Sequence, residues 1–112
     1  MGHGLEAAAG YEVYLHGEAV SVGMVGAARL GMAYGVTPAE LVERQAALIR
    51  RYGLPESYES VDPADILEAM SRDKKVSASQ ISWVFLNDVG RASMYSGVPT
   101  NLVEQTLREL CD

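Results

Sequence analysis

Both histidines of this 112-residue chain lie near its start, and each stands among residues that suit a binding site. His3 lies in the segment GHGLE (residues 2–6), and His16 lies in LHGEAV (residues 15–20). A neutral imidazole binds zinc, a protonated imidazole binds phosphate, and neighbouring glycines let a ligand approach the backbone closely. Because catalytic zinc needs three protein ligands and an open position, the two histidines predict only part of a site.

Each of these candidates also has a purely structural interpretation. His16 precedes a predicted helix, so it is either a metal ligand or a residue that caps this helix through a hydrogen bond. Glu6 and Glu18 either orient an imidazole or complement a helix N-terminus and face solvent. His3 is the weaker candidate of the two histidines. On spacing alone the structural interpretations are favoured.

A cluster of charges at residues 72–75, with the sequence RDKK, is expected to form a turn between a helix and a strand. In the structural interpretation the positive charges of this turn stabilise the C-terminus of the preceding helix. In the functional interpretation Lys74 reaches a phosphorylated or carboxylated substrate, and Asp73 holds the loop or a neighbouring lysine in place. The sequence contains no motif typical of a glycine-rich dinucleotide loop, a P-loop or a serine nucleophile elbow.

The composition suits one compact domain with a modest core, because 48% of the residues are hydrophobic. A formal net charge of -6 with scattered cations argues against nucleic acid as a partner. The single cysteine excludes an internal disulfide and fits a reducing compartment, so we expect a cytoplasmic protein. The apolar stretch 19–34 contains Ser21 and Arg29 and is shorter than the roughly 20 residues that cross a bilayer, so no membrane span is predicted.

Periodicity and the signals for helix starts and stops predict a mainly α fold, a helical bundle with one small β-hairpin. Gly10 is expected to end the first helix, and Thr37 is expected to cap the third, with Glu40 completing a capping box. The predicted helices span residues 5–10, 18–34, 37–51 and 62 to 70 or 71, with a last one from Asn101, and the predicted strands span 81–86 and 91–95. The side chains expected to be buried are Leu41, Ala47 and Leu48 in the third helix and Leu102, Val103, Leu107 and Leu110 in the last.

The helix predicted over 18–34 is apolar nearly all round, as expected for the central member of a bundle. Gly23, Gly26 and Gly31 weaken it by roughly 1 kcal/mol each relative to Ala, so close packing against neighbouring backbone is expected to compensate. The first helix lacks a start signal, which indicates that the domain belongs to a longer protein.

Five motifs together resemble the 3-dehydroquinate synthase family in their order and approximate spacing, over essentially the whole chain. They are GHGLEA (2–7), LHGEAV (15–20), GM (23–24), GLP (53–55) and RDKK (72–75). The resemblance implies that residues 1–112 form a single domain, the C-terminal metal- and substrate-binding half of a larger enzyme. The N-terminal NAD-binding domain of that enzyme would be absent from this chain.

The resemblance also implies an activity and roles for individual residues. The family converts 3-deoxy-D-arabino-heptulosonate 7-phosphate to 3-dehydroquinate with elimination of phosphate, a lyase step of the shikimate pathway to aromatic amino acids. It uses NAD transiently and zinc or cobalt as a Lewis acid. By motif position His16 would be a metal ligand, and His3 and Lys74 would bind substrate and act in catalysis. The whole enzyme is expected to be a cytoplasmic homodimer.

The chain departs from the family pattern at its start, where the asparagine-containing lead-in with an earlier histidine is missing and Gly4-Leu5 replaces the more usual alanine-isoleucine. With one metal-binding histidine and no NAD site, the isolated chain is expected to lack activity. Three alternatives remain: a related sugar-phosphate cyclase that makes an inosose or valiolone, an iron-type alcohol dehydrogenase domain, and a free-standing helical interaction module that associates through residues 18–34.

Overall fold

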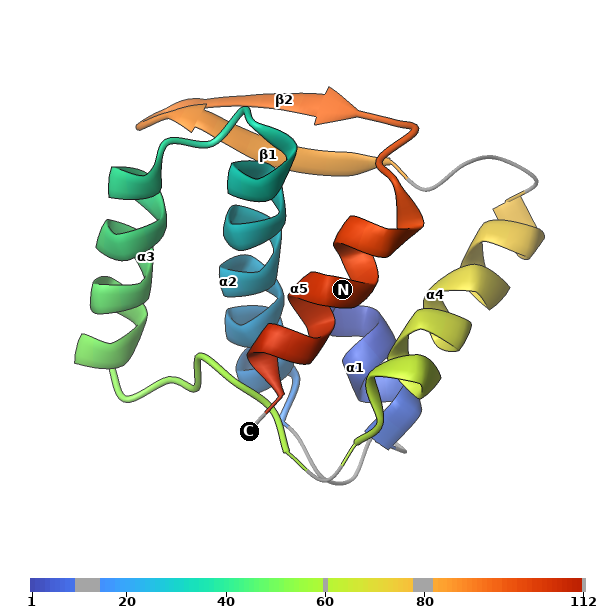
Figure 1. The fold of residues 1–112 in the computed structure, drawn as a ribbon. Helices are drawn as coiled ribbons and strands as arrows, with labels where there is room; N and C mark the ends of the chain where they lie inside the picture. The colour runs from blue at the N-terminus through green and yellow to red at the C-terminus, as the bar shows by residue number, and fades with distance from the viewer. Residues whose placement is uncertain (10–14, 60, 78–81, 112) are drawn as a thin grey trace.

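Five helices and two strands make up the described part of the chain, which comprises residues 1–9, 15–59, 61–77 and 82–111 of a computed structural model (Figure 1). The two strands form an antiparallel hairpin across one end of the helices (Figure 1). The predicted fold, a mainly α bundle with one small β-hairpin, is confirmed. In chain order the elements are α1 (Gly2–Ala9), α2 (His16–Tyr34), α3 (Ala39–Arg51), α4 (Pro63–Ser77), β1 (Trp83–Asp88), β2 (Arg91–Tyr95) and α5 (Thr100–Leu110).

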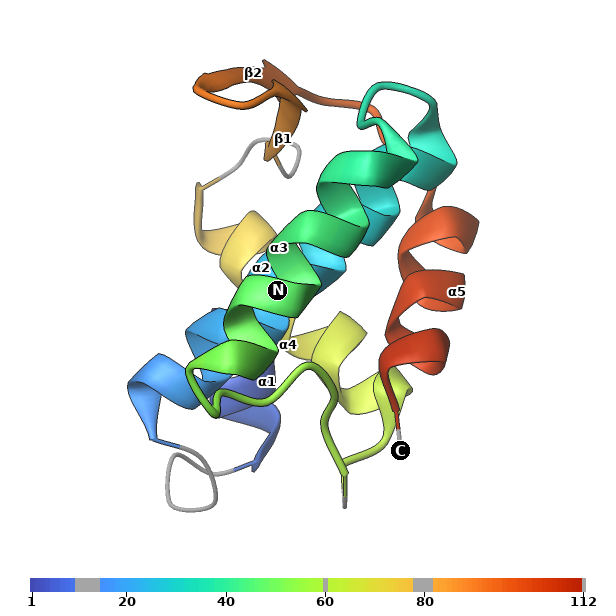
Figure 2. The same ribbon diagram turned by 90° about the vertical axis from the view of Figure 1, so that its left-hand side faces the viewer.

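Helix α2 is the centre of the fold and packs against α1, α3, α5 and β1. Figure 2 shows α3 crossing in front of α2, with α5 to the right of both. All three glycines are closely packed, but the neighbouring backbone that we predicted is found only at Gly23, which lies against Gly2. Side chains pack at the other two, those of Met1 and Leu110 at Gly26 and those of Thr37 and Phe85 at Gly31. The side chains that are almost completely buried around α2 include Leu5, Val22, Val25, Leu30, Ile66, Phe85, Leu107 and Leu110.

The start of α3 differs from the prediction that Thr37 caps it. Pro38 occupies the N-cap position, and no side chain caps the helix by a hydrogen bond. Thr37 is 5% exposed, and its side chain packs against Gly31 and so is not available to the first turn of α3. Tertiary packing therefore overrides the local capping signal at this position.

The face that α3 buries is also rotated from the prediction. Leu41 is buried as expected, whereas Ala47 and Leu48 are exposed. Because α3 packs against α2, a different face of the helix is buried. The other buried residues of α3 are Val42, Ala46 and Ile49.

Helix α4 is longer than predicted, because it continues through residues 72–75 to Ser77. The turn that we expected at RDKK is therefore wrong. No glycine or proline follows Met70 within the helix, and arginine and lysine are good helix formers, so nothing in the local sequence ends it there.

The hairpin and the last helix lie close to their predicted positions. β1 begins at Trp83, paired with Tyr95, and the start predicted at residue 81 lies outside the described residues, as does the stop predicted at Gly10. α5 begins at Thr100 and buries three of the four predicted side chains completely, while Leu102 is half-buried. None of the helices among the described residues has the length and hydropathy needed to cross a membrane.

Candidate functional site

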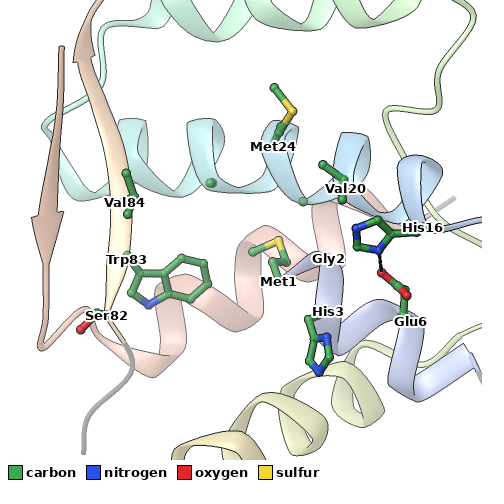
Figure 3. A pocket seen from close by; sticks show the side chains of 12 residues that line it. Met1, Gly2, His3, Glu6, His16, Val20, Met24, Ser82, Trp83 and Val84 are labelled. Atoms are coloured by element: carbon green, nitrogen blue, oxygen red, sulfur yellow. Dashed lines mark hydrogen bonds and ion pairs between the residues drawn. The ribbon is translucent and has the colours of Figure 1, made fainter. Parts of the chain in front are cut away.

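Helices α1 and α2 and the start of β1 line an open cavity of about 430 Å³, and both histidines lie along it (Figure 3). His3 comes from the first turn of α1, and His16 is the first residue of α2. Leu5 is 1% exposed and anchors α1 in the core between these two positions. The two motifs that the sequence singled out therefore meet at one site. The cavity is lined by Met1, Gly2, His3, Glu6, His16, Val20, Gly23, Met24, Ala27, Ser82, Trp83 and Val84.

A short contact joins the two histidine motifs. Nδ1 of His16 lies 2.6 Å from Oε1 of Glu6, and the His16 side chain is 80% exposed while that of Glu6 is 12% exposed. Because a carboxylate only accepts hydrogen bonds, Nδ1 donates and carries the proton in this pair. Glu6 therefore contacts an imidazole, which is the first of the two interpretations that the sequence left open.

Glu18 has the other role that the sequence left open. Its Oε1 accepts a hydrogen bond from the backbone N–H of Leu15 at 2.9 Å, so it complements the N-terminus of α2. His16 lies within the helix and is not its N-cap, a position taken by Leu15. The interpretation of His16 as the capping residue is therefore wrong.

The described residues do not form a complete metal site by themselves. No three of their histidine, cysteine, aspartate and glutamate side chains come together in a way that could hold a metal ion. His16 is the candidate ligand, and its assignment stays a prediction.

Lys74 lies in the C-terminal half of α4, where the structure describes the backbone but not the side chain. α4 packs against α1, so the helix that carries Lys74 adjoins the helix that carries His3. Its role as a substrate ligand stays a prediction.

Sequence reasoning missed the apolar wall of the cavity. Trp83 is 7% exposed and stacks on Phe85, with ring centroids 6.0 Å apart, and Met24 of α2 also lines the space. The signal was present in the alternation of β1, where Trp83 and Phe85 occupy the buried positions and Val84 the exposed one. This alternation predicts that one face of β1 is buried in the core, but it does not predict that the buried face borders a site.

The similarity to known proteins agrees with this arrangement. Residues 1–76 match the family described as 3-dehydroquinate synthase C-terminal. The chain belongs to the 3-dehydroquinate synthase family. It is 44% identical over 94 residues to the 3-dehydroquinate synthase of Thermoanaerobacter pseudethanolicus, covering 84% of this chain and 26% of that protein. It is 35% identical over 113 residues to that of a Synechococcus species, covering 100% of this chain and 31% of that protein.

A solved structure shows the same fold in a related enzyme. The crystal structure of 2-deoxy-scyllo-inosose synthase complexed with carbaglucose-6-phosphate, NAD+ and Co2+ matches with a TM-score of 0.78 and 26% identity. The match covers 96% of this chain and 32% of that protein. The chain thus spans about a third or less of the length of these proteins. Relatives named as enzymes cover the whole chain, so a free-standing interaction module is not favoured.

Proposed function

We propose that this chain forms the C-terminal, metal- and substrate-binding part of a 3-dehydroquinate synthase. The reaction is the conversion of 3-deoxy-D-arabino-heptulosonate 7-phosphate to 3-dehydroquinate with loss of phosphate. The observation that carries the proposal is the Glu6–His16 contact at a cavity that His3 also lines, in a chain whose residues 1–76 match this family.

The residues present fit a divalent cation as a partial set of ligands. Glu6 engages Nδ1 of His16, so in the neutral imidazole the lone pair is on Nε2, on an exposed side chain at the cavity wall. Imidazole suits both zinc and cobalt, and ligands beyond His16 would come from parts of the enzyme outside this chain. When bound, the cation supplies Lewis-acid polarisation of the substrate hydroxyl and carbonyl oxygens.

His3 and Lys74 would bind the anionic groups of the substrate. His3 is exposed at the cavity, where its imidazole can donate a hydrogen bond to a phosphate oxygen. A lysine provides a compact positive charge for phosphate or carboxylate. Trp83 and Met24 provide the apolar part of the cavity wall.

NAD would be bound outside this chain. The sequence has no glycine-rich dinucleotide motif, and the curated relatives are more than three times as long as the matched segment. A cytoplasmic homodimer is part of the same proposal, and the exposed apolar side chains of α2 support association.

A chimera tests the proposed function directly. The matched C-terminal segment of the Thermoanaerobacter enzyme is replaced by this chain, and phosphate release and 3-dehydroquinate formation are measured from the heptulosonate phosphate. We expect activity in the chimera, none in the isolated chain, and none after His16→Ala. Leu15→Ala, which truncates the exposed neighbour of His16, is the matched control and should remain active.

The structural similarity to 2-deoxy-scyllo-inosose synthase favours one second candidate, a related sugar-phosphate cyclase. The same chimera distinguishes the two reactions if a hexose 6-phosphate is assayed in parallel. Circular dichroism and NAD binding report whether the chimera is folded. A folded, NAD-binding chimera that turns over only the hexose phosphate would replace the proposal with the second candidate.

A further inference from the structure

The contact between Glu6 and His16 connects two helices at the edge of the cavity. Glu6 lies in the second half of α1 and His16 begins α2, ten residues later, with 2.6 Å between Oε1 and Nδ1. The neighbouring Leu5 is almost completely buried, so the backbone of Glu6 is fixed by the core. The Glu6 side chain is largely shielded from water, whereas the imidazole is open to the cavity.

The chemistry of this pair determines which ring nitrogen is available. An ionised carboxylate has no proton to donate, so it binds the tautomer of histidine that carries hydrogen on Nδ1. In this neutral tautomer the lone pair is on Nε2. Figure 3 shows this second nitrogen turned away from Glu6, on the side of the ring where Val20 and Gly2 line the cavity.

We infer that Glu6 is a positioning residue for His16, which selects the Nδ1–H tautomer and orients Nε2 to bind a divalent cation. This inference rests on the proposed function, in which His16 is a metal ligand. Carboxylates that hold a ligating histidine in this way orient the ring and raise its basicity, and their loss weakens metal binding by roughly 10–100-fold.

A carboxylate close by offers a matched control. Glu18 lies two residues after His16, but its Oε1 accepts a hydrogen bond from Leu15 N–H at 2.9 Å. Glu18→Gln removes the same charge near the ring without touching the Glu6–His16 contact. A general electrostatic effect would therefore appear in both variants, while a positioning effect appears only at Glu6.

The first readout is the tautomer of His16 in the metal-free chain, which long-range proton–nitrogen NMR of the imidazoles measures. We expect Nδ1–H in the parent chain and in Glu18→Gln. Glu6→Ala should shift the ring toward Nε2–H. Glu6→Gln keeps the size of the side chain and serves if the alanine variant is not folded. Its amide can donate to Nδ1, so the same shift is expected.

The second readout is Co2+ binding at His16, followed by paramagnetic broadening of the same signals. The apparent affinity should fall by roughly 10–100-fold in the Glu6 variants and stay close to the parent value in Glu18→Gln. An unchanged tautomer and affinity after substitution of Glu6 would overturn the inference while leaving His16 as the ligand. If His16 shows no response to Co2+ in the parent chain, the metal assignment itself fails, even where the tautomer depends on Glu6.

Discussion

Gly23 of α2 and Gly2 of α1 bring the backbones of their helices into direct contact. A Cβ atom on Gly23 would lie 2.8 Å from the backbone nitrogen of Gly2, and one on Gly2 would lie 2.7 Å from the carbonyl oxygen of Ala19. Only hydrogen fits at these positions. The close approach fixes the first turn of α1 against α2, and with it the relative positions of the two histidine motifs.

This contact predicts opposite effects of alanine at two glycines of α2. Gly23→Ala should destabilise the fold by about 1–3 kcal/mol, because backbone must move to admit the methyl group. Gly17→Ala is the matched control, since nothing lies within 4 Å of its Cβ position, and it should be neutral or stabilise by up to about 1 kcal/mol. Denaturant unfolding monitored by circular dichroism measures both. Equal stabilisation by the two substitutions would contradict the close contact.

The glycines show which features the sequence reveals. The helix predicted over 18–34 is apolar nearly all round and contains three glycines, so close packing on several sides, and with it the central place of α2, follows from local pattern alone. Strand composition on either side of residues 87–90, and Asn101 followed three residues later by Glu104, likewise mark the hairpin and α5 to within two residues. These signals depend on residues that are close together in the sequence, so they can be recognised without knowing the fold.

The features that the sequence did not reveal depend on partners far along the chain. The side chain of Thr37 packs at Gly31 and does not cap α3, and the exposure of Leu48 depends on which face of α3 meets α2. The Glu6–His16 contact likewise requires the arrangement of α1 and α2 in space. The sequence indicated that a glutamate could contact a histidine, but only the fold shows that this glutamate is Glu6 and not Glu18.

The isolated chain should bind zinc weakly. The described residues bring no three candidate ligands together, and a tight tetrahedral site needs three or four. Isothermal titration calorimetry should give a dissociation constant above the micromolar range, and His16→Ala should raise that constant further. Sub-micromolar affinity would mean that this chain completes a site by itself.

Lys74→Ala should lower kcat/KM in the active chimera by roughly 10–100-fold, because a hydrogen bond to a charged group contributes about 1.5–3 kcal/mol. The melting temperature should change little if the ammonium group contacts substrate and not the fold. Lys75→Ala is the control, with the same loss of charge one residue along α4. A large loss of activity at Lys75 with Lys74→Ala silent would move the role to Lys75.

A surface ion pair predicts a small dependence of stability on pH. Arg50 of α3 donates hydrogen bonds of 2.8 and 2.9 Å to the carboxylate of Glu56, and these lower the pKa of Glu56 from its ordinary value of 4.5. A lowered pKa in the folded state stabilises at neutral pH, and the contribution is lost as the pH falls through that pKa. The effect is small because solvent reaches the pair and screens it, Arg50 being exposed and Glu56 half-buried.

Arg50→Ala should therefore lower the melting temperature slightly at neutral pH. The difference from the parent chain should shrink in acid, where Glu56 is protonated in both proteins. Arg51→Ala removes the same charge from the next residue, which is also exposed, and should show no such convergence. Thermal unfolding of the three proteins across a pH series measures this. A difference that is constant with pH would show that Arg50 acts through packing.

The last prediction concerns an apolar surface between α2 and α3. Val20 and Met24 of α2 and Leu48 of α3 are 41%, 45% and 56% exposed, and they border a cavity of about 230 Å³ with Tyr52 and Leu54. Contiguous apolar surface of this kind marks a site of association. We expect the isolated chain to form dimers through it, with a sedimentation coefficient that rises with protein concentration.

Leu48→Glu tests the surface, because a charge at its centre opposes burial without disturbing the core. The variant should remain monomeric at concentrations where the parent chain associates. Val89→Glu is the matched control, since Val89 is 62% exposed at the turn of the hairpin and should leave association unchanged. Sedimentation velocity across a concentration series distinguishes these outcomes. A parent chain that is monomeric throughout and binds no hydrophobic dye would show that α2 and α3 cover this surface by themselves.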